Sequence, residues 1–221
     1  MNILAFDCSM TGCSSAIVLD GTRALAHGEA PSGIGQSEAL MPLLEQTIRE
    51  AGLGWRDLDL IGVTVGPGSF TGLRIGLSAA RGLALALGIP VVGVATPSAI
   101  AGGIPLAERI AQRSILVAID SKRADLFVQL FDSALMPLGP VTAMLPELAA
   151  QMTAEPPLLA GDGASRLTPV IPGAALSRAP TRPDPVVLAA LAIKEFEAGS
   201  ALPAQPIYLR AADVTMPGVA P

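Results

Sequence analysis

The chain has 221 residues, which is enough for one large domain or for two domains of about 100 residues each. Hydrophobic residues make up 51% of the sequence and aromatic residues only 3%, so the core must be packed mainly from aliphatic side chains and few rings can stack on bases. This scarcity of rings and the net charge of -5 argue against a dedicated nucleic-acid-binding protein, because such proteins usually carry a basic excess.

Two short β-rich runs open the chain. Residues 3–6 (ILAF) and 15–19 (SAIVL) are separated by a polar segment, and the second run is followed by Asp20 and Gly21, a dipeptide favoured in tight hairpins. The pattern predicts an antiparallel sheet with Asp7 at its tip. No basic segment precedes these apolar residues, which argues against a signal peptide.

A first helix is predicted over residues 38–51, because apolar residues recur there at helical spacing. We expect Ser37 to cap its start and Gly52 to end it, and Pro42 to kink it or to mark a later start. The inward face of this helix is expected to consist of Leu40, Leu43, Leu44, Thr47 and Ala51.

The next elements alternate between strands and helices. Residues 60–65 (LIGVTV) and 91–95 (VVGVA) are typical of buried strands, and the segment between them predicts a helix over 71–87 that Gly88 terminates. Thr96 is the expected N-cap of a further helix, from residue 97 to about 111.

The second half of the chain begins with a similar pattern. Residues 115–120 (ILVAID) and 126–131 (LFVQLF) predict a hairpin with Asp120 at its tip, residues 157–164 a strand and a glycine turn, and residues 184–199 a helix. Because this order resembles that of the first half, we expect an internal duplication, although no sequence period shows it directly.

The cysteine and histidine content argues against several kinds of site. Cys8 and Cys13 are too few for a disulfide framework, fit reduced thiols of the cytosol, and have no second pair to complete a zinc site. His27 is the only histidine and lies in a polar stretch, so we expect a solvated loop residue rather than a metal ligand or part of a catalytic triad. Arg81 and several glycines interrupt the most apolar segment, so we expect no membrane span and a cytoplasmic protein.

The segment around Asp7 admits two interpretations. A strand ending in aspartate, followed by a turn rich in serine, threonine and glycine and by a second strand, is the arrangement with which sugar kinases and actin hold a nucleotide phosphate. Asp7 and Ser9 would then belong to a phosphate site. An aspartate followed by serine at a strand tip is also typical of an ordinary Asx turn, and the sequence leaves both interpretations open.

The stretch GPGSFTG, residues 66–72, likewise has two interpretations. It is not a P-loop, because Gly72 is followed by leucine and arginine where that motif requires lysine. The amides of residues 68–72 at a helix start can still bind a phosphate through the helix dipole. The simpler interpretation is a strand-to-helix turn that needs unusual dihedral angles, which accounts for Gly66 and Gly68.

Small residues recur every four positions along the predicted helix 71–87, at Gly72, Gly76, Ala80 and Ala84. A glycine inside a helix costs about 1 kcal/mol relative to alanine, so this stripe needs a compensating contact. Small-residue stripes let another helix approach closely, while burial against the chain's own sheet explains the stripe equally well. The sequence leaves both open.

These segments together resemble the TsaB (YeaZ) family. The resemblance rests on ILAFDCSMTGCSSAIVLDG, SEALMPLLEQTI, GPGSFTGLRIGLSAARGLALALGIPVVGVAT, AIDSKRADLF, AGDG and PIYLR. It implies an α/β fold of the actin-like, ribonuclease H-like type, with mixed sheets flanked by helices. It also implies two subdomains: residues 1–105, which carry a helical dimerisation face, and residues 106–221, a degenerate copy of the same plan.

The resemblance further implies a non-catalytic subunit of tRNA threonylcarbamoyladenosine synthesis. Members of the family pair with the catalytic subunit TsaD, the ATPase TsaE engages the pair, and TsaC supplies the adenylate intermediate, so that tRNA is met only through the complex. TsaD needs a metal-binding histidine motif, which a chain with His27 alone does not have. The resemblance therefore implies no catalytic residue, metal or cofactor in this chain, and it leaves open whether the isolated chain forms a homodimer.

Members of the family associate through their first two long helices. The contact residues that the resemblance implies are Leu40, Leu43, Leu44, Gly72, Gly76, Ala80 and Ala84, and the vestige of the phosphate site is Asp7, Ser9, Gly68 and Ser69. Gln36 stands where many relatives have a histidine before the first helix, which puts any role of that histidine in doubt. The alternative function is an active small-molecule kinase of the actin-like ATPase class, which would need an adenosine-binding glycine motif in the second half and a catalytic aspartate.

Overall fold

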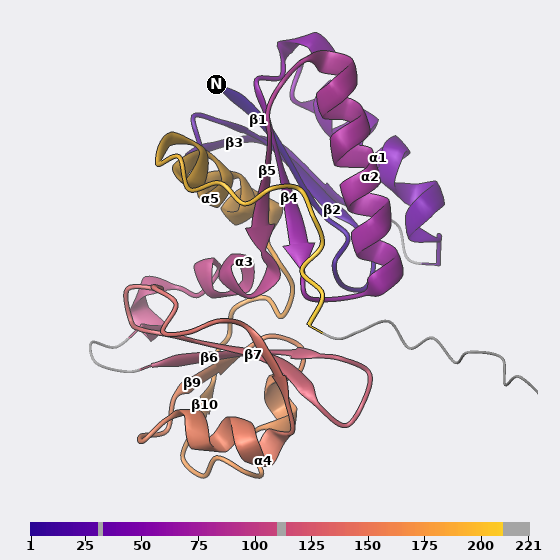
Figure 1. Cartoon of the computed structure of the whole chain (residues 1–221). Coiled ribbons are helices and arrows are strands. Elements are labelled where there is room, and N and C mark those ends of the chain that lie inside the picture. The colour runs from indigo at the N-terminus through magenta and orange to yellow at the C-terminus, as the bar shows by residue number, and fades with distance from the viewer. Residues whose placement is uncertain (31–32, 110–113, 210–221) are drawn as a thin grey trace, which may run out of the picture.

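Two five-stranded mixed sheets, one above the other in Figure 1, form the framework of the chain. The computed structural model describes residues 1–30, 33–109 and 114–209. The first sheet has the order β3-β2-β1-β4-β5 and the second the order β10-β9-β6-β7-β8.

The first sheet contains the predicted N-terminal hairpin. Strands β1 (Asn2–Asp7), β2 (Ser14–Leu19) and β3 (Arg23–Glu29) are antiparallel neighbours, while β4 (Leu60–Gly66) and β5 (Val91–Ala95) run parallel to β1. The prediction that His27 lies in a loop is wrong, because His27 lies in β3, a strand that the sequence pattern does not predict. Its side chains are mostly exposed at the sheet edge, so it lacks the apolar alternation that identifies β1 and β2.

The second sheet repeats the arrangement of the first. Strands β6 (Ile115–Asp120), β7 (Leu126–Phe131) and β8 (Thr142–Met144) are antiparallel neighbours, and β9 (Leu158–Ala160) and β10 (Ala175–Leu176) run parallel to β6. Read in the opposite direction, the second sheet has the order β8-β7-β6-β9-β10. Its strands therefore follow the same order as β3-β2-β1-β4-β5 of the first sheet, with β6 in the place of β1. The shared order and directions support the predicted internal duplication and the actin-like α/β fold.

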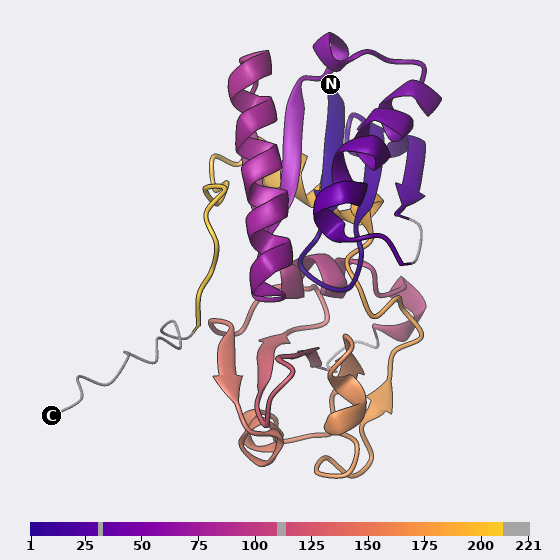
Figure 2. The same ribbon diagram turned by 90° about the vertical axis from the view of Figure 1, so that its right-hand side faces the viewer.

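The two long helices lie side by side on one face of the first sheet (Figure 2). Helix α1 spans Gln36–Glu50 and α2 spans Phe70–Leu87. Helix α5 (Pro185–Glu197) covers the opposite face, and α3 (Thr96–Gly102) contributes buried residues toward both sheets. The remaining helical segments are short: α4 (Pro146–Ala149), η1 (Trp55–Asp57), η2 (Leu106–Glu108), η3 (Ala150–Met152) and η4 (Ala164–Arg166).

Three predicted helix boundaries are wrong: the start of α1 and both ends of α3, which begins at Thr96 with Ala95 as its N-cap. Helix α1 begins at Gln36 with Gly35 as its N-cap, so Ser37 does not cap it and Pro42 lies inside it. Helix α3 ends at Gly102, whereas the expected end near residue 111 lies outside the described residues. The Gly102-Gly103 pair explains the early end, because glycine is a poor helix former. By contrast, Gly88 adopts a left-handed conformation with φ 69° and ends α2 as predicted.

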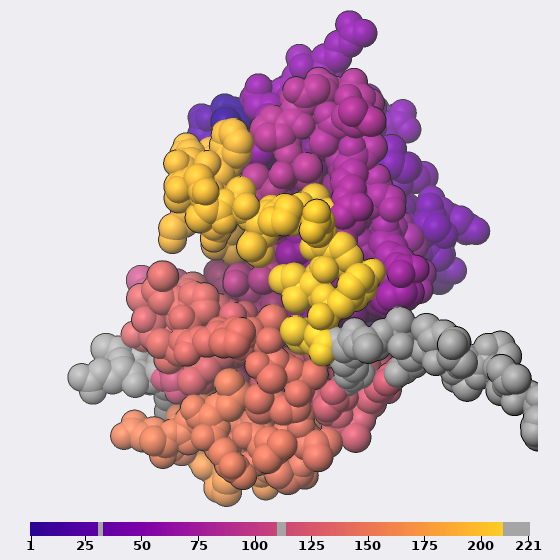
Figure 3. Space-filling view, in the orientation of Figure 1, coloured from indigo at the N-terminus to yellow at the C-terminus, as the bar shows by residue number. Residues whose placement is uncertain are grey.

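The C-terminal part of the chain returns to the first sheet. After α5, the Gly93 amide donates to Leu202 O at 2.8 Å and the Ile207 amide donates to Val65 O at 2.8 Å. Figure 3 shows this segment in yellow, lying across the molecule beside α2. The predicted boundary near residue 105 falls between α3 and β6, and the chain crosses it again before α5. The division into subdomains 1–105 and 106–221 stays a prediction.

Helix α2 is long and apolar enough to cross a membrane by length and composition alone, with a mean hydropathy of 1.2. Helices that pack in the core of globular proteins pass the same test, so a single helix of this kind is weak evidence for a membrane span. In this structure, the inward face of α2 packs on the sheet beside Val63 and Val65. The expectation that the chain does not span a membrane stays a prediction.

Candidate functional site

The Asp7 carboxylate lies at the carboxyl ends of β1 and β4 and is almost completely buried. Its Oδ1 atom accepts hydrogen bonds from the Ser9 amide at 2.8 Å and from Thr64 Oγ1 at 2.6 Å. The bond from Ser9 is the Asx-turn geometry that the sequence analysis gave as one interpretation. Burial raises the pKa of Asp7, and the hydrogen bonds from Ser9 and Thr64 oppose that rise in pKa only in part.

The four residues expected to form a vestigial phosphate site do come together, and backbone groups of Ser9 and Ser69 bond within the set. The Ser69 amide donates to Ser9 O at 2.6 Å, and Ser69 Oγ accepts the Gly72 amide at 3.2 Å. A Cβ atom on Gly68 would overlap Ser9 O, so the β1–β2 loop lies directly on the start of α2. The Ser69 amide at this helix start is therefore occupied within the chain, and a phosphate-binding role for this set stays a prediction with little geometric support.

A small cavity opens beside Asp7 between the β1–β2 loop, β3 and residues 180–185. Its volume is about 150 Å³, whereas pockets that bind small molecules typically have roughly 300–1,000 Å³. Arg182 spans this region, donating to Glu29 Oε2 at 3.0 Å and to Thr11 O at 3.2 Å. The cavity is too small for a nucleotide in this conformation.

The raised pKa of Asp7 predicts that the free energy of unfolding depends on pH, and Asp7→Asn should remove this contribution. In the folded state the Asp7 carboxyl keeps its proton up to a higher pH than in the unfolded chain. At pH values just above 3.8, the ordinary pKa of an aspartate, the folded state therefore binds more protons than the unfolded chain. The free energy of unfolding of the wild type, relative to Asp7→Asn, should therefore rise as the pH falls from neutral toward 4. Denaturant titrations of both proteins at several pH values measure this difference. A difference that shrinks on acidification would contradict the raised pKa.

No group of three or more His, Cys, Asp or Glu side chains within residues 1–30, 33–109 and 114–209 is arranged to hold a metal ion. The second copy of the hairpin tip uses its polar groups internally. The Asp120 amide donates to Asp162 Oδ1 at 2.8 Å, and Arg166 Nη1 bonds Asp120 Oδ1 at 3.0 Å. The AGDG turn thus supports β6 through these bonds.

The seven residues expected to contact a partner are buried inside the chain. They are Leu40, Leu43, Leu44, Gly72, Gly76, Ala80 and Ala84. A Cβ on Gly76 would lie 3.6 Å from Cys8 Cβ and 3.8 Å from Val63 Cγ2, and a Cβ on Gly72 would overlap Cys8 O. The small-residue stripe therefore faces the sheet and the β1–β2 loop, which corrects the expectation that these side chains themselves meet a partner helix.

The outer faces of the same two helices carry exposed apolar side chains that the sequence analysis missed. Leu85 on α2 is 87% exposed and Met41 on α1 is 43% exposed. A groove of about 530 Å³ separates the helices and is lined by Met41, Pro42, Glu45, Trp55, Leu83, Ala86 and Leu87. In the sequence, these positions differ from the small-residue stripe only in carrying leucine on α2. Leucine occurs both on buried faces and on contact faces of helices, so the sequence does not show that this face is exposed.

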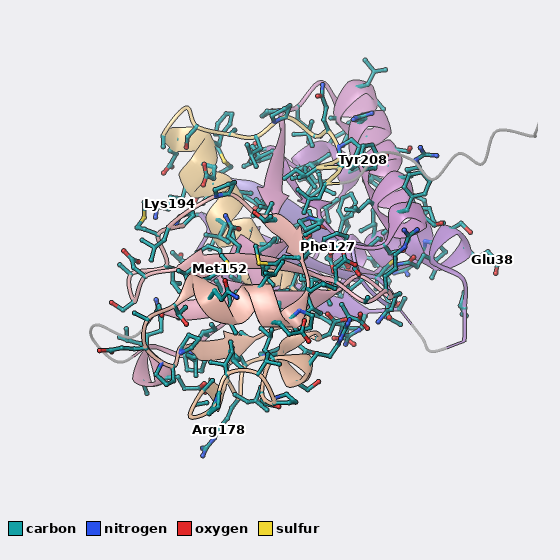
Figure 4. All side chains as sticks on the ribbon, turned by 60° about the horizontal axis from the view of Figure 1, so that its bottom comes forward. Glu38, Phe127, Met152, Arg178, Lys194 and Tyr208 are labelled. Carbon is teal, nitrogen blue, oxygen red and sulfur yellow. The ribbon has the colours of Figure 1, made fainter. Side chains whose placement is uncertain are left out.

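Two arginines of α2 hold the C-terminal segment against the helix. Arg81 Nε donates to Ala204 O at 2.6 Å, and Arg74 Nε donates to Tyr208 Oη at 3.3 Å. The Arg74 guanidinium also lies 3.8 Å from the centre of the Phe70 ring, which is 5.8 Å from the Tyr208 ring. Figure 4 shows Tyr208 close to the α2 ribbon, whereas Glu38 projects outward from α1.

Gln36 has a structural role in this chain. Its Nε2 atom lies 3.0 Å from Cys8 O, 2.9 Å from Met10 O and 2.6 Å from Gly12 O, and its two N–H groups are shared among these three carbonyls. The first residue of α1 therefore anchors the β1–β2 loop. A charged or metal-binding role at this position is not needed to explain the residue found here.

Comparison with known proteins places this fold among characterised relatives. Residues 34–134 match the family described as TsaD, tRNA N6-adenosine threonylcarbamoyltransferase. The tRNA threonylcarbamoyladenosine biosynthesis protein TsaB of Escherichia coli (strain K12) is 34% identical over 128 residues, covering 58% of this chain and 53% of that protein. The chain thus spans about half the length of this curated relative and of the Haemophilus influenzae TsaB, of which it covers 52%.

Two further matches cover most of the chain, and the first of them is to a relative that is described as uncharacterized. The Mycobacterium tuberculosis (strain ATCC 25618 / H37Rv) protein Rv3421c is 33% identical over 177 residues, covering 80% of this chain and 76% of that protein. The solved structure of YeaZ from Pseudomonas aeruginosa superimposes with a TM-score of 0.78 at 26% identity and covers 94% of this chain and 99% of that one. On its fold, its GPGSFTGLRIG motif and these similarities, the chain belongs to the TsaB (YeaZ) family.

Proposed function

We propose that this chain takes part in threonylcarbamoyladenosine synthesis on tRNA as a non-catalytic subunit that pairs with a TsaD-type transferase. The observation that carries the proposal is family membership, with a structural match to YeaZ from Pseudomonas aeruginosa over nearly the whole chain. The name of the Escherichia coli relative, a tRNA threonylcarbamoyladenosine biosynthesis protein, supplies the pathway.

The geometry of the Asp7 region supports a subunit without its own chemistry. The Asp7 carboxylate is buried and bonded to Ser9 and Thr64, and the adjoining cavity of about 150 Å³ is crossed by Arg182. Catalytic groups need access to a substrate, whereas the Asp7 carboxylate is buried and bonds within the chain. The proposed contribution of this chain is therefore to bind and position other proteins.

We place the TsaD contact on the outer faces of α1 and α2. This surface combines the exposed side chains of Met41 and Leu85 with the groove between the helices. Exposed apolar side chains around a groove are typical of protein contact sites, because their burial removes apolar area from water. The residues first expected at this contact would then act indirectly, by holding the two helices at their positions on the sheet.

Other components follow from the same proposal. TsaE engages the pair, TsaC supplies the threonylcarbamoyl-adenylate, and tRNA meets this chain only within the complex, in the cytoplasm. A chain whose α1–α2 face lacks a partner can pair with a second copy of itself through that face. We propose such a homodimer as the state of the isolated chain.

No observation favours the alternative function, an active small-molecule kinase of the actin-like ATPase class. Such a kinase needs a phosphate site in the first half and an adenosine site in the second half. The Ser69 amide at the start of α2 is taken by Ser9 O, and Asp162 in the AGDG turn accepts the Asp120 amide and lies 3.7 Å from Lys122 Nζ. The Ser69 amide and the Asp162 carboxylate are therefore already bonded within the chain.

A reconstituted reaction tests the proposed function. The purified chain is mixed with TsaD, TsaE, TsaC, ATP, threonine, bicarbonate and unmodified tRNA, each protein is omitted in turn, and threonylcarbamoyladenosine is measured in hydrolysed tRNA. We expect no product from this chain alone and at least a tenfold loss of product when it is omitted. Product formed by this chain in the absence of TsaD would contradict the non-catalytic role, and full activity without this chain would contradict the proposed pathway.

A further inference from the structure

Two cysteine side chains meet in the loop between β1 and β2. Cys8 follows the last residue of β1 and Cys13 precedes the first residue of β2, and both are free thiols. Their sulfur atoms lie 2.6 Å apart, and the side chains are buried, with 1% and 3% of their surfaces exposed. The fold therefore brings two thiols into direct contact that the sequence separates by four residues.

The pair lies beneath both long helices. Cys8 lies against α2. A Cβ atom on Gly72 would overlap the Cys8 carbonyl oxygen, and a Cβ atom on Gly76 would lie 3.9 Å from Cys8 Sγ. Cys13 Sγ lies 3.9 Å from Gln36 O, at the first residue of α1. A change in the bonding of the two sulfurs would thus occur where the β1–β2 loop supports the starts of α1 and α2.

The two thiols differ in their chemical environment. Cys13 lines the cavity beside Asp7, whereas Cys8 does not. A hydrogen bond from Cys8 lowers the pKa of Cys13, while the same bond and burial raise the pKa of Cys8. The thiolate is the nucleophile in thiol–disulfide exchange, so Cys13 is the residue placed to attack first.

We propose that Cys8 and Cys13 form a redox-active dithiol that closes to an intramolecular disulfide by exchange with a low-molecular-weight disulfide. The Cys13 thiolate attacks one sulfur of the reagent RSSR, which forms a mixed disulfide and releases one thiolate RS⁻. Cys8 then loses its proton and attacks the Cys13 sulfur, which closes the Cys8–Cys13 bond and releases the second RS⁻. Two electrons pass from the cysteines to the reagent, which is reduced to two thiols once protonated.

The experiment uses the full reduced chain, native buffer and an excess of 2-hydroxyethyl disulfide, with mass spectrometry of samples quenched in acid. We expect the mass to fall by two hydrogen atoms, no lasting adduct, both thiols lost together, and full reversal by dithiothreitol. We also expect closure to be faster in the folded chain than in the same chain in denaturant, because the fold holds the sulfurs together. Two thiols that persist in the folded chain, or a stable mixed disulfide, would overturn the proposal.

Single substitutions separate the two steps. In Cys8→Ser, Cys13 should accumulate a mixed disulfide because no second thiol can displace the reagent. In Cys13→Ser, Cys8 should react about tenfold more slowly or not at all, because its side chain is buried and does not line the cavity beside Asp7. Equal adduct rates in the two variants would overturn the assignment of Cys13 as the attacking residue, and this comparison does not depend on the proposed role in tRNA modification.

Discussion

Replacing Gly72 by alanine is expected to lower the free energy of unfolding by about 1–3 kcal/mol, although alanine is the better helix former. The added methyl group would overlap Cys8 O and approach the Gln36 amide group, so the backbone of the β1–β2 loop would have to move. Gly82→Ala in the same helix is expected to do the opposite and to stabilise the chain by about 0.5–1 kcal/mol. Nothing lies within 4 Å of a Cβ at Gly82.

Urea titrations of the wild type and the two variants measure both changes. Gly76→Ala is a further control, because its methyl group would make only ordinary contacts, the nearest at 3.6 Å. It should therefore be close to neutral or stabilising. If Gly72→Ala and Gly82→Ala were equally stable, the small-residue stripe would not pack against the β1–β2 loop, and the partner-facing interpretation of the stripe would regain support.

Leu85→Glu is expected to weaken binding to a TsaD-type partner by about tenfold or more and to reduce modified adenosine in the reconstituted reaction accordingly. Leu85 is 87% exposed, so the change should alter the free energy of unfolding by no more than about 0.5 kcal/mol. The loss would arise because a carboxylate must give up its water shell when the contact forms. Titration calorimetry with the partner and a thermal unfolding curve of the isolated variant give the two readouts.

Leu106→Glu provides a matched control for this prediction. Leu106 is 75% exposed and lies in η2, away from α1 and α2. The same change of charge and size at this position should leave both partner affinity and product unchanged. If Leu85→Glu bound the partner as tightly as Leu106→Glu does, the outer face of α2 would not be the contact surface, and a partner would have to bind elsewhere on the chain.

The sequence by itself determined the main elements and much of their order. Strands β1, β4 and β6 are short, continuous apolar runs between polar turns, and the hairpin ends at Asp7 and Asp120 follow from those turns. These features depend on neighbouring residues, because strand burial and turn chemistry are local properties. For the same reason, Gly88 marked the end of α2 correctly.

The edge elements could not be predicted in the same way. Strand β3 is largely exposed and β10 has two residues, so neither carries a periodic apolar signal. They exist because a neighbouring strand offers unpaired amides and carbonyls, which is a property of the assembled sheet. The C-terminal segment is a similar case, since its path depends on bonds to Gly93, Val65 and Arg81 that are distant in sequence.

Only the tertiary structure decided which face of α2 is buried. The helix carries small residues on one side, but leucines surround them, so its sequence pattern is compatible with packing in either direction. The choice depends on distances between backbones: Ser9 O lies so close to Gly68, and Cys8 O so close to Gly72, that a side chain at either glycine would require the β1–β2 loop to move. The helical spacing of residues in a sequence shows which of them share a face of the helix. Whether that face contacts a sheet of the same chain or a partner depends on residues that are far away in the sequence.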